Sequence, residues 1–323
     1  MKDTNYYKFI EKFGIPEKIQ DNVDLIFNKI EASIMVMIAD AEGDSDEISK
    51  SLNIDISETE TILNSLYYRG YVSRIKRGER YFYKAEDYKT ILYQFIDLEF
   101  DKLTDIQRKP FQKEFMDSYL QVFEKSLHPV FKVIPVEEAL DEFVPHLIIP
   151  YTKASEILAQ SKQIVVIDCI CRKTMRRFDK PLNVCLVLGE ATDFYVERGI
   201  GEVLTQKQAQ EILKLASDSD LVHTMDNPAM RYPTHIICNC DDQACVYIRG
   251  LKEFGSDKAI TKSGYIPVTD FSLCTNCGTC VDKCIFGARI MENGKLQFIK
   301  DKCYGCGLCV KNCQVEAIRM GVL

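Results

Sequence analysis

Apolar residues near the start of the chain recur at the spacing of an α-helix. They are Val23, Ile26, Phe27, Ile30, Ile34, Met37 and Ile38. Two capping-box pairs then introduce two further amphipathic helices: Asp44 with Glu47, and Ser57 with Glu60. Gly70 ends the third helix, and residues 71–76 and 80–84 predict two short strands around the turn Lys76-Arg77-Gly78-Glu79. The pattern over residues 1–95 is therefore three helices followed by a hairpin.

This order of elements resembles a winged helix-turn-helix domain of bacterial and archaeal regulators. The resemblance implies DNA contact, protein docking or homodimerisation. The third helix begins Ser57-Glu58-Thr59-Glu60, whose carboxylates would repel phosphates. The hairpin is basic, with Arg74, Lys76, Arg77, Arg80 and Lys84. The sequence thus leaves open whether this winged-helix-like domain binds DNA.

The rest of the chain divides by composition into three further regions. Residues 96–150 are amphipathic and acidic, and we expect a helical connector. Residues 151–262 alternate strand and helix patterns and carry six cysteines, which predicts a central α/β domain. Residues 263–323 carry eight more cysteines. The expected fold class is α+β with several domains.

The distribution of cysteines along the chain gives the strongest indication of function. All fourteen cysteines follow residue 168. The N-terminal residues lack the pattern of a secretory signal, and no apolar run has the length of a membrane span, so we expect a cytoplasmic protein. In a reducing compartment such density favours metal ligation over disulfides. The net charge of −7 argues against a dedicated nucleic-acid binder, although a local basic patch is compatible with it.

The last eight cysteines form a repeated motif. Cys274-x2-Cys277-x2-Cys280-x3-Cys284 returns as Cys303-x2-Cys306-x2-Cys309-x3-Cys313. The motif resembles the bacterial two-[4Fe-4S] ferredoxin domain. That resemblance implies that Cys274, Cys277, Cys280 and Cys313 hold one cluster, and that Cys303, Cys306, Cys309 and Cys284 hold the other. Ile285 and Gln314 replace the proline that usually follows the fourth cysteine. Paired zinc sites, the alternative, usually use separated Cys-x2-Cys knuckles.

The other six cysteines are less regular. Cys169 and Cys171 follow the apolar run 163–168, and Cys238 and Cys240 follow the run 234–237. Cys185 and Cys245 come downstream, Cys245 inside a predicted helix that runs to about residue 254. Three interpretations are open. The first is a third cluster or metal site built from four of the six cysteines, with both Cys-x-Cys pairs favoured as ligands. The second is a thiol redox site or a substrate site. The third is that Cys185 and Cys245 are simply buried as small apolar residues.

A second resemblance covers residues 150–323. It rests on Asp168-Cys169-Ile170-Cys171-Arg172, Val184-Cys185-Leu186-Val187-Leu188-Gly189, Leu221-Val222-His223 and Cys238-Asn239-Cys240, followed by the two-cluster segment. These stretches resemble ferredoxin-type 4Fe-4S-binding proteins of anaerobic bacteria and archaea. The second cysteine patch of that family is often richer, and Asp241, Asp242 and Gln243 stand there instead. A carboxylate ligand is therefore an alternative to a complete extra cluster.

The sequence favours electron transfer. We expect the two C-terminal clusters to relay single electrons to or from a redox partner protein, and the central domain to carry an additional iron–sulfur cluster or zinc, or to dock the partner. The alternative is a redox-responsive winged-helix transcription regulator. A third class is a reductase that uses the central cysteines. If the protein is an enzyme, it is an oxidoreductase, and no catalytic residue can be named.

Overall fold

The computed structural model describes residues 4–140, 153–231 and 233–323. Its fold is mixed α+β. The chain forms two compact units, which are described separately: Met1–Ser118 with Glu197–Gly199, and Tyr119–Val196 with Ile200–Leu323. Within the described ranges, every helix is too short or too polar to cross a lipid bilayer.

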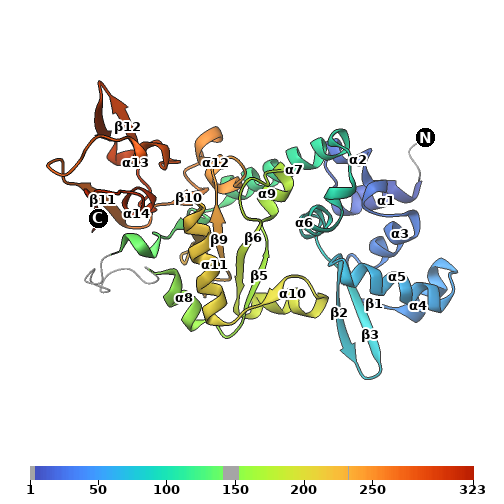
Figure 1. The fold of residues 1–323 in the computed structure, drawn as a ribbon. Coiled ribbons are helices and arrows are strands. Elements are labelled where there is room, and N and C mark those ends of the chain that lie inside the picture. The colour runs from blue at the N-terminus through green and yellow to red at the C-terminus, as the bar shows by residue number, and fades with distance from the viewer. Residues whose placement is uncertain (1–3, 141–152, 232) are drawn as a thin grey trace. The chain divides into compact units, whose positions relative to one another are not determined.

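The first unit is mainly helical, with a small antiparallel sheet in the strand order β1-β3-β2 (Figure 1). Its elements are α1 (Thr4–Phe13), α2 (Glu17–Gln20), α3 (Lys29–Met37), β1 (Gly43–Asp44), α4 (Ser45–Leu52), α5 (Ile56–Tyr68), β2 (Val72–Arg77), β3 (Arg80–Ala85) and α6 (Tyr88–Glu99), and α7 (Asp105–Lys125) begins in this unit. The predicted hairpin is present as β2 and β3, whose register pairs Arg77 with Arg80.

Two helix starts in this unit differ from those predicted. The apolar run 23–38 is interrupted at Asn28, which caps α3 and forms a capping box with Glu31. α5 begins after Asp55, whose carboxylate accepts hydrogen bonds from the backbone N–H groups of Ser57 and Glu58. The predicted cap at Ser57 is therefore wrong, because a carboxylate two residues earlier satisfies the same free N–H groups. α4 starts as predicted, with Asp44 accepting from the backbone of Glu47.

The second unit is built on a seven-stranded sheet in the order β10-β4-β8-β9-β6-β5-β7. Its strands are β4 (Phe131–Val133), β5 (Ile164–Asp168), β6 (Asn183–Leu188), β7 (Glu202–Val203), β8 (Val222–Asp226), β9 (Ile236–Cys240) and β10 (Ile260–Thr261). All neighbouring pairs are antiparallel except β10 with β4. The helices of this region are α8 (Ala154–Gln160), α9 (Ile170–Met175), α10 (Asp193–Arg198), α11 (Gln206–Asp218) and α12 (Val246–Phe254). β4 lies within the segment expected to be a helical connector.

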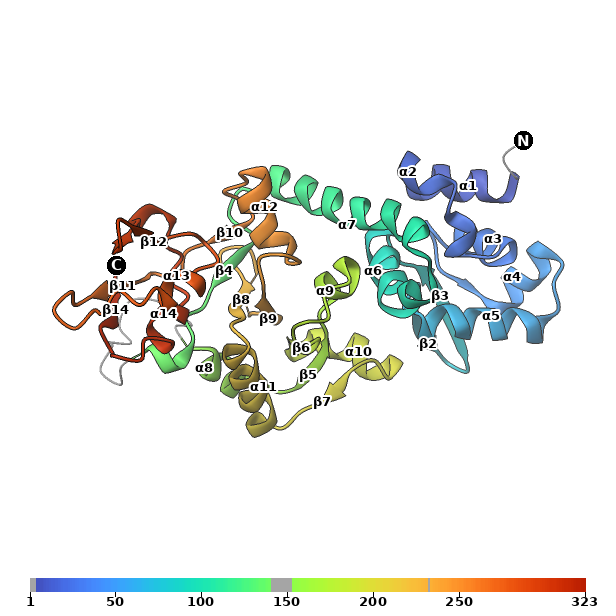
Figure 2. The same ribbon diagram turned by 45° about the horizontal axis from the view of Figure 1, so that its top comes forward.

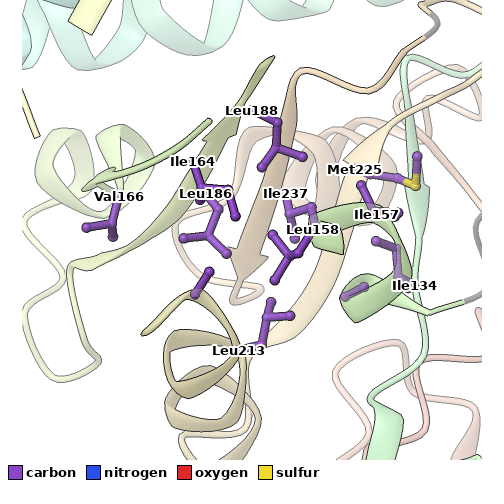
Figure 3. Packing of buried hydrophobic residues seen from close by; sticks show 12 residues of the cluster. Ile134, Ile157, Leu158, Ile164, Val166, Leu186, Leu188, Leu213, Met225 and Ile237 are labelled. Carbon is purple, nitrogen blue, oxygen red and sulfur yellow. The ribbon is translucent and has the colours of Figure 1, made fainter. Parts of the chain in front are cut away.

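One face of this sheet carries the main core of the unit (Figure 3). Alternate residues of a strand point to the same face, and so Ile164 with Val166 and Leu186 with Leu188 enter the same layer. α8 and α11 cover that layer, α11 through Leu213. α11 opens with a capping box formed by Thr205 and Gln208. Burying each of these side chains contributes about 1.5–3 kcal/mol.

The C-terminal part of the second unit contains the order strand, helix, strand twice (Figure 2). It contains β11 (Tyr265–Thr269), α13 (Thr279–Asp282), β12 (Arg289–Glu292), β13 (Lys295–Phe298), α14 (Leu308–Lys311) and β14 (Ile318–Val322). β11 pairs with β14, which joins the start of the segment to its end. The two helices follow Gly278 and Gly307, which both have a φ of 83°. The duplication in sequence is thus a duplication in backbone conformation.

Candidate metal centres

Two cavities lie in the C-terminal segment, and four cysteines line each. One is bordered by Cys274, Cys277, Cys280 and Cys313. The other is bordered by Cys284, Cys303, Cys306 and Cys309. The two cavities have the same small volume, about 20 Å³ each. In each cavity three cysteines come from one repeat and the fourth from the other, which is the crossed arrangement that the sequence resemblance implies.

Burial makes four of these eight thiols hard to ionise without a positive charge nearby. It raises the pKa of Cys309 to about 11, and it raises the pKa of Cys306 further. The pKa values of Cys280 and Cys303 rise for the same reason. A thiolate is the form that binds metal, and so such a quartet requires cations to compensate its charge.

Polar groups approach the sulfurs directly. The backbone N–H of Ala288 donates to Sγ of Cys284 at 3.2 Å, and Sγ of Cys277 lies 3.4 Å from Oγ1 of Thr279. The Thr279 contacts lower the pKa of Cys277, the one cysteine of the fourteen that is fully exposed. Donors of this kind stabilise negative charge on sulfur and shift the potential of a cluster.

Arg289 was not singled out from the sequence, although it lies at the centre of this segment. Its side chain is 1% exposed. Nη1 donates to Oγ1 of Thr269 at 3.0 Å, whereas Nε and Nη2 have no hydrogen-bond partner among the described residues. The guanidinium faces the thiols of Cys280 and Cys309 and opposes the rise in their pKa values. Ile318 occupies the equivalent position in the second repeat. A charged residue at a position that is apolar in the other repeat is the sequence signal that could have identified Arg289.

The second cavity is closed by aromatic side chains and by the chain segment that follows β4. The rings of Phe286 and Tyr304 stack with centroids 4.5 Å apart beside the cavity. The backbone N–H of Val136 donates to the carbonyl of Cys306 at 2.9 Å. A Cβ on Gly307 would meet the Cβ of Ala139 at 2.7 Å. The loop around Cys306 therefore packs tightly on residues 136–139.

The central cysteines lie together at one end of three neighbouring strands of the large sheet, β5, β6 and β9. β5 and β9 both run antiparallel to β6, so the C-terminal ends of β5 and β9 meet the N-terminal end of β6. Cys169 follows β5, Cys185 lies near the start of β6, and Cys238 and Cys240 end β9. The β6–β9 register pairs Leu186 with Ile237, which puts Cys185 opposite Cys238. Sheet topology thus gathers cysteines that are far apart in sequence.

The six central thiols form one closed ring. Neighbouring thiols shift one another's pKa values around this ring: Cys169 with Cys171 and Cys185, Cys240 with Cys238 and Cys245, Cys171 with Cys245, and Cys185 with Cys238. None of them is in a disulfide, and five of the six residues are buried. The structure therefore brings together Cys185 and Cys245 as well as the two favoured pairs. Cys245 caps α12 instead of lying inside it, since its φ and ψ are extended.

Arg172 accompanies this ring. Its side chain is completely buried. Nη1 donates to the carbonyl of Asn239 at 2.8 Å and to a carboxylate oxygen of Asp241 at 3.3 Å, whereas Nε and Nη2 have no hydrogen-bond partner among the described residues. The negative charges of Cys169, Cys185 and Cys240 lie close enough to raise its pKa. Thr224 adds a contact of 3.4 Å from Oγ1 to Sγ of Cys240.

The six thiols of the ring differ in how readily they ionise. Hydrogen bonds from neighbouring thiols lower the pKa of Cys240 to about 5 and hold that of Cys169 well below its usual value. The pKa values of Cys171, Cys185, Cys238 and Cys245 are raised. In the parts of the chain that the structure describes, no three His, Cys, Asp or Glu side chains already converge on a single ion position.

Comparison with known proteins finds a match for the C-terminal segment alone. No curated protein and no solved structure matches the chain. Residues 273–318, which contain the eight cysteines of both cavities, match a family model described as a 4Fe-4S dicluster domain. This match supports an iron–sulfur electron-transfer role, and the C-terminal segment is similar to ferredoxin-type 4Fe-4S domains.

Proposed function

We propose that this protein transfers single electrons through two [4Fe-4S] clusters in its C-terminal segment. The observation that carries the proposal is the pair of nearly equal cavities, each lined by three cysteines of one repeat and one of the other. Cys274, Cys277, Cys280 and Cys313 would hold one cluster, and Cys303, Cys306, Cys309 and Cys284 the other. A bound cluster of this type supplies a one-electron redox centre.

The residues around the cavities suit that role. Both donor sets consist of four cysteine sulfurs, the usual ligand set of a [4Fe-4S] cluster. The unpaired Nε and Nη2 donors of Arg289 offer hydrogen bonds and positive charge to the sulfur of either cluster. Phe286 and Tyr304 limit water beside the second cavity, which lowers the local dielectric constant.

The two cavities differ in access, which suggests where a redox partner binds. Cys277 is exposed, whereas Cys306 is hydrogen-bonded to the chain segment that begins at Val136. A partner protein can therefore approach the cluster held by Cys277 most closely. In this proposal the cluster near Cys306 passes electrons inward, and the central cysteines hold the additional metal or cluster centre that the sequence indicated.

Anaerobic purification followed by iron and sulfide analysis tests the cluster assignment. We expect at least about eight irons and about eight acid-labile sulfides per chain. Electron transfer is then measured by reducing the protein with a low-potential donor and mixing it with an oxidised one-electron acceptor. Zinc without sulfide in the C-terminal quartets, or clusters that fail to exchange electrons, would exclude this function.

The second candidate function is a redox-responsive transcription regulator. It is favoured by the predicted winged-helix-like order of elements in the first unit, because domains of that kind can bind DNA. The charged residues of the hairpin weigh against it. Arg80 pairs with Asp44 at 2.9 Å and Arg77 with Glu42 at 2.6 Å, so two of the hairpin's cations already have protein partners. A gel-shift assay on the DNA upstream of the protein's own gene, with and without reductant, tests the idea. Absence of a shift in both states would exclude it.

A further inference from the structure

We propose that a cavity at the end of the large sheet opposite to the central cysteines binds a free α-amino acid with a large apolar side chain. Glu190 and Asp193 hold the ammonium group of this ligand, Lys162 holds its carboxylate, and Thr234 forms a hydrogen bond with it. The site is separate from the C-terminal clusters, and the proposed electron transfer does not require it.

The cavity lies at the far ends of the strands that carry the central cysteines. It is bordered by residues just before β5, just after β6 and just before β9. β5 has five residues, which span about 17 Å, and Cys169 follows its other end. A molecule in the cavity is therefore separated from the cysteine thiols by the length of a strand, and the cavity is a binding site of its own.

Hydrogen bonds hold the walls of the cavity together. The backbone N–H of Gly189 donates to the carbonyl of Gln163 at 3.0 Å, and that of Leu188 donates to the carbonyl of His235 at 2.8 Å. Oγ1 of Thr192 donates to Oε1 of Gln163 at 2.7 Å. The volume is about 430 Å³, which is within the range of small-molecule sites. A cavity that is already formed costs less ordering when a ligand enters.

The floor of the cavity is apolar. Ile157 and Leu188 line it, and both belong to the main core of the unit (Figure 3). An apolar group that packs against them leaves water and adds to that core, which favours binding. The floor therefore requires a ligand with an apolar body.

The wall contains a buried hydroxyl that points to a ligand. Thr234 lines the cavity and is 6% exposed, and its Oγ1 has no hydrogen-bond partner among the described residues. Leaving a buried polar atom unpaired is costly, and folded proteins contain few such atoms. A polar atom of a bound molecule would supply the missing partner.

Three charged side chains decide the class of that molecule. Lys162, Glu190 and Asp193 line the cavity, and none of them forms an ion pair within the described parts of the chain. A phosphate or another simple anion would meet two carboxylates here, and a simple cation would meet the ammonium of Lys162. A zwitterion instead gives charge-assisted hydrogen bonds to both kinds of group. A free α-amino acid carries both charges and, as its side chain, the apolar body that the floor requires.

Calorimetric titration of the full-length, anaerobically purified protein with L-leucine and L-phenylalanine tests the proposal. We expect saturable binding of at least one of them. Its N-acetyl derivative has no ammonium, the corresponding amine has no carboxylate, and glycine has no apolar body. Each of these three analogues should bind about tenfold or more weakly. No binding of either amino acid, or an analogue that binds as tightly as its parent, would overturn the proposal.

Substitutions in the walls assign the charges. Glu190→Gln combined with Asp193→Asn should weaken binding of the amino acid about tenfold or more, but should not weaken binding of the N-acetyl derivative, which has no ammonium. Lys162→Met should weaken binding of the amino acid but not of the amine. Glu202→Gln and Lys207→Met remove exposed charges outside the cavity and are the matched controls. Losses no larger than those of the controls would overturn the assignment.

Thr234→Val separates contact with the ligand from packing. Valine has nearly the same shape but lacks the unpartnered hydroxyl, so the melting temperature without ligand should stay the same or rise. The affinity for the amino acid should fall about fivefold. A lower melting temperature with unchanged affinity would overturn the contact with Thr234. The analogue series with the unaltered protein tests the site even if a variant does not fold.

Discussion

Cys280 and Cys309 occupy equivalent positions in the two repeats, and both face the buried guanidinium of Arg289. A single positive charge therefore acts on both proposed clusters. Because reduction adds negative charge, this cation should favour the reduced state of each cluster.

Replacing that cation tests the effect. Arg289→Met should lower the reduction potentials of both clusters by on the order of 100 mV, since a unit charge about 6 Å away contributes roughly 3 kcal/mol at an effective dielectric constant of about 20. Arg319→Met removes the same charge from an exposed position on β14 and should change the potentials much less. A potentiometric titration of both variants measures the shifts. Equal small shifts would show that Arg289 has a packing role only.

Gly278 and Gly307 provide a matched pair for the contact between the C-terminal segment and residues 136–139. Both have a φ of 83°, so alanine introduces similar backbone strain at each, about 1 kcal/mol. A Cβ at 278 has open space, whereas one at 307 would lie 2.7 Å from the Cβ of Ala139 and 3.1 Å from Cγ2 of Val136. Gly307→Ala should therefore lose stability by about 1–3 kcal/mol more than Gly278→Ala.

The rate of iron release to a chelator under anaerobic conditions measures this difference. We expect faster release from Gly307→Ala than from Gly278→Ala, with the excess coming from the cluster held by Cys306. Similar rates for the two variants would mean that the 136–139 segment does not support that loop.

The crossed ligand sets predict a pattern of non-additive losses. Cys284→Ala and Cys303→Ala should each remove the same cluster, about four irons, because both residues line one cavity. The double variant should lose no more than either single variant. Combining Cys284→Ala with Cys280→Ala should remove both clusters, although these two cysteines belong to the same repeat. Iron content and the spectrum of the reduced protein measure each case, and the opposite pattern would indicate uncrossed ligation.

The sequence predicts the C-terminal ligands because their chemistry lies in local spacing. Three cysteines at two-residue intervals need only one tight loop, and the duplication supplies the fourth. The central ring could not be derived in this way. Cys185 and Cys238 meet only because β5, β6 and β9 are antiparallel neighbours, and strand order is not encoded in a short motif.

Local competition explains the smaller differences. Asp55 caps α5 because its carboxylate precedes Ser57, and Asn28 with Glu31 interrupts a run whose apolar spacing alone predicts a continuous helix. Cys245 precedes α12 for a similar reason, since its backbone is extended. Arg289 was missed because a buried arginine violates the usual hydrophobic pattern, and the sequence does not show which anion it faces.

The most direct test of the account is a reductive titration of the anaerobically purified protein, followed by EPR spectroscopy and by counting the electrons consumed. We predict about two electrons per chain, one for each C-terminal cluster, and magnetic interaction between the two reduced clusters, because the guanidinium of Arg289 faces a cysteine of each. No electron uptake, or a single electron without spin coupling, would contradict the existence of two adjacent one-electron clusters.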